Sequence, residues 1–167
     1  MQNSKQVNPL LTKIEQGIEA KIKPENKQAY TRIVIAGMKV MFDEKTHQMM
    51  SDQLKSSNDI VKNVAEGIAG LMMLLYKESK EKMPMVAAIP ASIVLMAKAL
   101  DFAEKTMSVQ ITPDMLAKVT QATSEAVLLK FGITPEMVQD AVNKHQSGQG
   151  ASMPPPAKPT GLINQGA

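Results

Sequence analysis

The chain of 167 residues contains no cysteine and no tryptophan, and its only histidines are His47 and His145. Cysteine and histidine supply most of the nucleophiles, transition-metal ligands and acid–base groups that work near neutral pH. Neither histidine is grouped with carboxylates at a spacing typical of a metal site. We therefore predict a non-enzymatic protein that uses no cofactor and no metal. The absence of cysteine also excludes disulfides, which suits a reducing compartment.

Aromatic residues are scarce as well, at 3% of the chain, so the core must be built from aliphatic side chains. The formal net charge of +3 is spread along the sequence and forms no basic stripe. Proteins that bind nucleic acid usually show such a stripe or aromatic residues for stacking on bases. We therefore expect no specific nucleic-acid recognition. The N-terminus has no apolar signal core, so we also expect no secretion by the ordinary route.

Methionine, in contrast, is abundant, with 14 in the chain. Its unbranched and polarizable side chain fills irregular gaps and makes adaptable contact surfaces. Apolar residues recur at intervals of three and four from residue 10 to residue 145, which is the periodicity of amphipathic helices. No segment alternates with a period of two. The sequence predicts an all-α fold, a bundle of five to six helices within one domain over residues 1–146.

Prolines and charged residues divide the helical pattern. Pro24 stands where a helix would begin, as does Pro84 after the charged corner at residues 77–82. A single apolar pattern runs from residue 47 to residue 80. Pro90 falls inside the helix that follows Pro84, so a kink is expected there, because proline removes a hydrogen-bond donor and crowds the preceding turn.

The strongest local signal is a pair of similar segments, Ile111-Thr-Pro-Asp-Met115 and Ile133-Thr-Pro-Glu-Met137. In each, threonine is the predicted N-cap, proline the first helical residue, and the carboxylate lies near the positive end of the helix dipole. Gly132 is a natural C-cap for the helix between them. An alternative interpretation is that Asp114 and Glu136 form a catalytic acid–base pair. Such a pair would need a nucleophile, and the sequence has none nearby. We interpret them as charges at helix starts.

Residues 147–167 are rich in glycine and proline and have little that could pack in a core. We predict an extended tail, with Pro154–Pro156 in a polyproline II conformation. Two interpretations of this tail remain open. It is either an inert extension or a tether whose Leu162 and Ile163 dock on a neighbouring subunit.

Two stretches without charge, Gly67–Tyr76 and Met85–Ala97, are shorter than the roughly 20 residues that span a bilayer as a helix. We favour their burial in the bundle, and the alternative is insertion of residues 67–97 into a membrane as a hairpin. Gly67 and Gly70 lack the Lys-Ser/Thr that completes a phosphate loop, so we expect them to let two helices approach closely.

Adjacent methionines such as Met72 and Met73 point about 100° apart on a helix, so one of each pair should lie near the surface. Exposed apolar patches usually mark interfaces. We therefore expect the chain to form an oligomer or to dock on a larger protein, through residues 67–97 before any other region. Closed rings are one geometry for repeated copies. The candidate interface residues are Leu71, Met72, Met73, Met83, Met85, Met96, Leu162 and Ile163.

Short segments spread from residue 74 to residue 137 form a recognisable set. They are Leu74-Leu-Tyr-Lys77, Met83-Pro84, Ile89-Pro-Ala91, Leu100-Asp-Phe102, Thr123-Ser-Glu-Ala126 and the two Ile-Thr-Pro starts. Together they resemble small helical virion proteins of tailed phages, most of all the short-tailed phages that carry a giant RNA polymerase inside the capsid. The resemblance covers about residues 60–145.

This resemblance implies a structural protein of the virion, present in several copies and made in the host cytoplasm. It would belong to the internal core, the DNA ejection apparatus or the portal–tail region. Its partners would be further copies of itself and other virion proteins, namely portal, core or ejection proteins. The resemblance supplies no catalytic residues. The alternative from another class is a membrane-active helical protein whose hairpin 67–97 enters a bilayer during infection or lysis.

Overall fold

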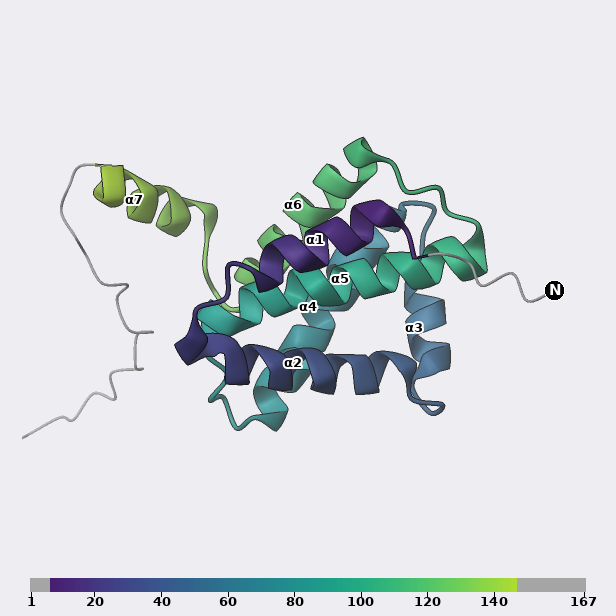
Figure 1. The fold of residues 1–167 in the computed structure, drawn as a ribbon, viewed down its shortest axis with the longest axis horizontal. Coiled ribbons are helices and arrows are strands. Elements are labelled where there is room, and N and C mark those ends of the chain that lie inside the picture. The colour runs from purple at the N-terminus through teal and green to yellow at the C-terminus, as the bar shows by residue number, and fades with distance from the viewer. Residues whose placement is uncertain (1–6, 147–167) are drawn as a thin grey trace, which may run out of the picture. The chain divides into compact units, whose positions relative to one another are not determined.

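The computed structural model describes residues 7–146, and over this range it has seven α-helices and no strand (Figure 1). The helices are α1 (Pro9–Glu19), α2 (Pro24–Phe42), α3 (His47–Leu54), α4 (Ile60–Glu78), α5 (Met85–Met107), α6 (Pro113–Lys130) and α7 (Pro135–Gln146). The prediction of an all-helical chain is confirmed. The predicted tail over residues 147–167 lies outside the described residues.

The chain separates into two compact units at the bond between Gly132 and Ile133. The first unit holds α1 to α6 and the second holds α7. The first unit therefore contains six helices, because the apolar pattern over residues 47–80 forms two helices, α3 and α4, with a turn at residues 55–59 between them.

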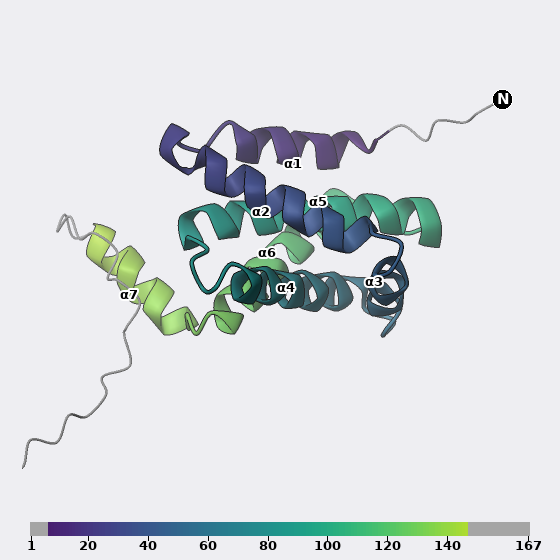
Figure 2. The same cartoon turned by 90° about the horizontal axis from the view of Figure 1, so that it is seen from below.

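The central element of the first unit is α5, which packs against α1, α2, α4 and α6. Figure 2 shows α1 and α2 on one side of α5, with α4 and α6 on the other. Twelve of its 23 residues are buried, six of them alanines. These small side chains let α5 accept neighbours around most of its circumference. The helix continues past Pro90, which lies near its start.

Both Ile-Thr-Pro segments start helices as predicted. The Thr112 hydroxyl oxygen accepts a hydrogen bond from the Met115 amide over 3.2 Å, and Thr134 accepts one from the Met137 amide over 3.4 Å. Each threonine thus satisfies one of the free amides at a helix start. Gly132 has a φ of 74°, the left-handed conformation typical of glycine after a helix end.

The charged corner predicted at residues 77–82 joins α4 to α5. Lys80 and Glu81 have φ values of 54° and 61°, in the region that favours glycine over residues with a Cβ. The Glu81 amide donates a hydrogen bond to the Tyr76 carbonyl oxygen over 2.9 Å. This bond closes the end of α4 in the way that a glycine-containing cap usually does, although no glycine is present.

Candidate functional site

Six of the predicted interface residues lie on α4, on α5 and on the corner between them. Four of these are buried in the core of the first unit: Leu71, Met72, Met83 and Met96. Two are partly exposed: Met73 and Met85. Leu162 and Ile163 lie outside the described residues. In this fold the four buried side chains hold the bundle together, and a partner could reach them only after a rearrangement. The pair Met72 and Met73 divides between core and surface, as expected.

The two helix-start carboxylates are exposed and lie on separate units. Asp114 forms an ion pair with Lys118 over 2.8 Å, and this hydrogen bond raises the pKa of the Lys118 ammonium group. A hydrogen bond from the Thr134 hydroxyl lowers the pKa of Glu136. Among residues 7–146, no group of three or more His, Cys, Asp or Glu side chains could hold a metal ion.

The buried side chain of Tyr30 has a shifted pKa. Burial, together with the charges of Glu19 and Glu15, raises its pKa to about 12. The phenol is therefore protonated at neutral pH. The neighbouring Glu15 is paired with Lys98 of α5 over 2.7 Å, an ion pair that fastens α1 to α5.

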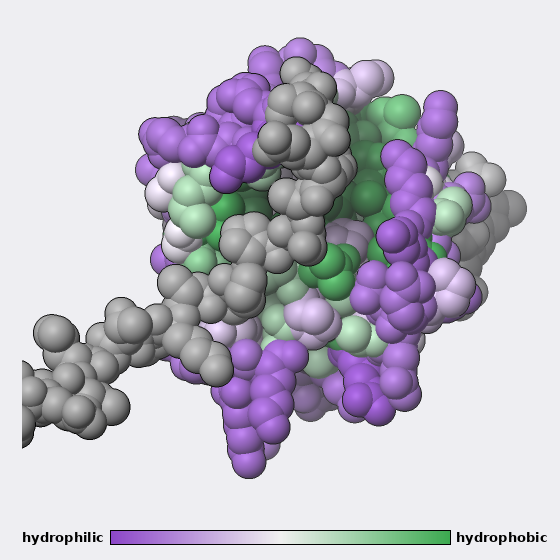
Figure 3. All heavy atoms as spheres, turned by 90° about the vertical axis from the view of Figure 1, so that its left-hand side faces the viewer, coloured by the Kyte–Doolittle hydropathy of each residue, from purple (hydrophilic) through white to green (hydrophobic). Residues whose placement is uncertain are grey.

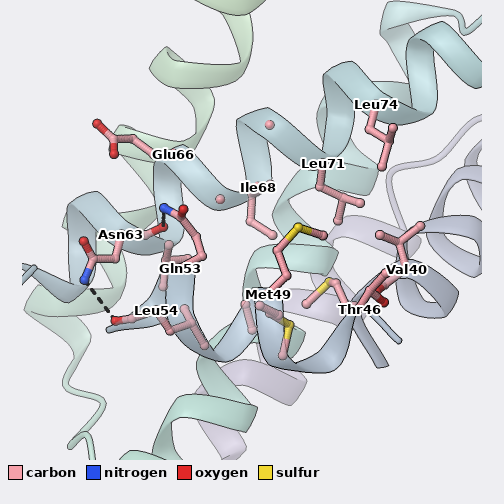
Figure 4. Close-up of a pocket in the computed structure, with 16 residues that line it drawn as sticks. Val40, Thr46, Met49, Gln53, Leu54, Asn63, Glu66, Ile68, Leu71 and Leu74 are labelled. Carbon is pink, nitrogen blue, oxygen red and sulfur yellow. Dashed lines mark hydrogen bonds between the residues drawn. The ribbon is translucent and has the colours of Figure 1, made fainter. Parts of the chain in front are cut away.

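An apolar groove of about 300 Å³ opens between α2, α3 and α4 (Figure 4). Its size is at the lower end of the range for ligand pockets. The apolar lining comes from Val40, Met41, Met49, Met50, Leu54, Val64, Ile68, Leu71, Leu74 and Ala99. Two of these side chains remain substantially exposed: Met49 at 60% and Leu74 at 40%. The groove is thus an apolar surface that the helices of the first unit leave partly exposed.

Gly67 and Gly70 of α4 lie in the wall of this groove. A Cβ at Gly70 would meet no atom within 4 Å, and a Cβ at Gly67 would lie 3.0 Å from Cγ of Gln53. Gly67 therefore lets α3 approach α4, as predicted, whereas the same prediction is wrong for Gly70. Gly70 faces open space, and its missing side chain leaves room in the groove.

Asn63, only 1% exposed, holds one end of the groove in place. Its Nδ2 donates hydrogen bonds to the carbonyl oxygens of Leu54 and Ser57 over 2.9 and 2.8 Å. Its Oδ1 accepts from the hydroxyls of Ser56 and Ser57 over 3.0 and 2.7 Å. Gln53 donates to the Asn63 carbonyl oxygen over 3.3 Å, a bond drawn in Figure 4. Because these bonds fix α3 on α4, the groove is formed before any partner binds.

Taken by itself, the second unit has an apolar helix face. Met137, Val138 and Val142 of α7 are 54%, 39% and 43% exposed. At 100° per residue they fall on one side of the helix, and Glu136 and Asp140 fall on the other. A short amphipathic helix with an exposed apolar face is a common recognition element for a groove on another protein.

No family model, curated protein or solved structure matches this chain.

One described helix, α5, is long and apolar enough to cross a membrane, but 61% of its most apolar stretch is buried inside the bundle. Core helices of globular proteins commonly have these properties. Val86, where α5 begins, is exposed. Figure 3 shows apolar surface between hydrophilic side chains on one face of the molecule. The exposed part of α5 is thus limited to a few positions.

The groove was not predicted from the sequence, although the sequence contains one signal for it. Ser56-Ser-Asn-Asp59 is a run of turn-forming residues, which favours a break in the helical pattern. Asp59 caps α4 by accepting a hydrogen bond from the Lys62 amide over 3.1 Å. If two helices had been predicted on either side of this run, Met49 and Gly70 would have been candidates for a surface formed by both helices.

Proposed function

We propose that this chain is a non-enzymatic structural protein of a tailed-phage virion. It is present in several copies and belongs to the internal core, the ejection apparatus or the portal–tail region. The observation that carries the proposal is the groove between α2, α3 and α4, which exposes Met49 and Leu74 on a rigid bundle. Exposed apolar patches usually mark interfaces. The resemblance of residues 60–145 to small virion proteins supports the choice of a virion.

The mechanism in this proposal is packing. The aliphatic core, with α5 at its centre, keeps the bundle rigid, and hydrogen bonds from Asn63 keep the groove open. Methionine side chains at the groove adapt to partners that are not identical, such as further copies of the chain and larger portal, core or ejection proteins. The C-terminal segment 147–167 serves as the tether to a neighbouring subunit.

The test is quantitative mass spectrometry of virions purified from cells infected by the phage that encodes the chain. We expect several copies per particle that remain after nuclease treatment and washing in high salt. Groove variants such as Met49→Glu should lower this copy number, while an exposed control such as Gln48→Glu on the same helix should not. Particles that contain none of the protein would refute the virion proposal.

A second candidate function is supported by the length and apolar character of α5. In this case the hairpin 67–97 leaves the bundle and enters a bilayer. Purified protein added to vesicles of phosphatidylethanolamine and phosphatidylglycerol separates the two functions. A structural protein stays soluble without detergent and releases no trapped dye, whereas a membrane-active protein releases dye at micromolar concentrations.

A further inference from the structure

We propose that α1 is a detachable strap, which leaves α5 as a unit while α2 to α6 keep their packing and so uncovers one apolar side of α5. This inference does not depend on a role in the virion. It concerns the described helix that is long and apolar enough to cross a membrane. The strap is a conformational device that keeps part of this helix covered.

The first helix, α1, contributes few buried residues to the core. Leu11 is the only buried residue among its 11, whereas eight of 19 residues are buried in α4 and twelve of 23 in α5. Leu10, Ile14 and Ile18 pack against the core but stay partly exposed. Because burial of apolar surface is the main favourable term in packing, release of α1 requires less free energy than release of α4 or α5.

Two polar contacts hold α1 on α5. Asn8, the N-cap of α1, donates a hydrogen bond from Nδ2 to Glu104 Oε1 over 2.8 Å. Lys98 Nζ forms an ion pair with Glu15 Oε2 over 2.7 Å, and these two side chains remain 32% and 21% exposed. Ion pairs that water can reach contribute little to stability. These contacts therefore direct α1 to its position on α5 without fixing it strongly.

The side of α5 beneath α1 can be located from these two contacts. Lys98 and Glu104 lie about 120° apart around the helix, and Val94, Ala97 and Asp101 fall between them. Val94 and Ala97 are 3% and 0% exposed. Release of α1 would therefore bring these two apolar side chains into contact with water.

Closure of α1 has an unfavourable component as well. The Tyr30 hydroxyl and Asp101 Oδ1 are buried and have no hydrogen-bond partner in the part of the chain that the structure describes. Tyr30 lies beside α1, since burial and the charges of Glu19 and Glu15 raise its pKa to about 12. Burial of a polar atom without a partner destabilises the closed state. Both atoms could bind water once α1 leaves, which favours opening.

The connection between α1 and α2 permits such a movement. The amides of Lys21 and Ile22 donate hydrogen bonds back to the carbonyl oxygens of Ile18 and Glu19. Lys23 has an extended backbone with a ψ of 146°, and its side chain makes no capping bond to α2. The chain can therefore turn at Lys23 while α2 stays in place.

The test measures the accessibility of a buried position beneath α1, in a chain that has no cysteine of its own. Full-length protein with Val94→Cys is treated with a maleimide under native conditions. The matched control is Val127→Cys of α6, which is also buried and lies across α5 from α1 (Figure 2). Cysteine is smaller than valine, so neither site is overpacked. We expect labelling at position 94 to be about tenfold faster, because local opening requires less free energy than global unfolding.

A second pair of variants tests what holds the strap. Glu15→Gln removes the charge that pairs with Lys98 and should speed the labelling of Val94→Cys about threefold. It should leave the labelling of Val127→Cys unchanged. Glu19→Gln removes the same charge from an exposed position of the same helix and should change neither rate.

Equal labelling rates at positions 94 and 127 would overturn the inference, because α1 would then leave only when the whole unit unfolds. Equal acceleration of both positions by Glu15→Gln would overturn it too. If Val94→Cys does not fold, amide hydrogen exchange of the unmodified chain decides. A helix as short as α1 is marginal in isolation, so its amides exchange when it leaves. We expect one common opening free energy across α1, below that of α5, and protection at Ile14 equal to that in α5 would overturn the inference.

Discussion

Gly37 of α2 lies so close to Leu95 of α5 that an added Cβ would be 2.5 Å from Leu95 Cδ1 and 2.7 Å from Cδ2. Leu95 is fully buried, so it has no open space into which it could move. The absence of a side chain at Gly37 is therefore what lets α2 pack on the central helix.

Gly37→Ala should destabilise the protein by roughly 1–3 kcal/mol, because overpacking outweighs the better helix propensity of alanine. Gly70→Ala is the matched control, since a Cβ there meets nothing within 4 Å. It should raise the free energy of unfolding by up to about 1 kcal/mol. Urea denaturation followed by circular dichroism measures both. A Gly37→Ala protein as stable as the parent would show that α2 and α5 are packed more loosely.

Asn63→Ala should cost roughly 1–3 kcal/mol, because the carbonyl oxygens of Leu54 and Ser57 lose a buried donor. Asn58 in the same turn is exposed, and Asn58→Ala should change stability by no more than about 0.5 kcal/mol. Amide hydrogen exchange over residues 54–60 provides a local measurement. We expect faster exchange in this turn for Asn63→Ala alone, and equal exchange in the two variants would contradict the role of Asn63.

Lys80→Gly should stabilise the protein by about 1 kcal/mol, since Lys80 has a φ of 54° and glycine adopts this conformation without a Cβ penalty. Lys77→Gly, inside the last turn of α4, should instead destabilise by up to about 1 kcal/mol. Thermal unfolding of the two variants should therefore shift in opposite directions. A shift in the same direction would contradict the left-handed conformation at Lys80.

The hydrogen bond from Thr134 should make the start of α7 sensitive to acid. It holds the pKa of Glu136 below its ordinary value of 4.5. A group whose pKa is lowered in the folded state stabilises that state above the unfolded pKa, and the effect is lost as the pH falls through the folded pKa. Helicity of α7 should therefore decrease below about pH 4.5.

NMR titration of the Glu136 carboxyl group measures this directly. Thr134→Val should raise the pKa of Glu136 toward its ordinary value, because the hydroxyl donor is removed. Thr112→Val, the equivalent change at the start of α6, should leave the Glu136 titration unchanged. An unshifted titration in Thr134→Val would assign the lowered pKa to the backbone amides alone.

The helical fold was predictable because the residues that start and end its helices are adjacent in the sequence. Threonine followed by proline marks the starts of α6 and α7, and Gly132 marks the turn between them. The division between α3 and α4 was missed because the apolar spacing continues across it. The turn between α3 and α4 depends on hydrogen bonds from the Asn63 side chain to the carbonyl oxygens of Leu54 and Ser57. The spacing of apolar residues contains no information about these bonds.

The surface was less predictable than the fold. Met72 and Met73 were expected to divide between core and surface, and they do, but nothing in the sequence shows that Met96 is enclosed on all sides. Burial depends on how many helices meet at α5. Likewise, Gly37 and Gly70 are both helical glycines, yet one faces a leucine and the other faces open space. Such differences arise from tertiary packing.

The central position of α5 has a consequence during synthesis on the ribosome. The faces of α1 and α2 that pack on α5 are made first, and their partner begins only at Met85. At 5–20 residues per second, the roughly 65 residues from the end of α2 to the end of α5 take about 3–13 s. During this interval Leu11, Ile33 and Met41 have no finished core to enter. The nascent chain therefore emerges as an open, apolar N-terminal half, and its first helices need α5 before they can become part of the core.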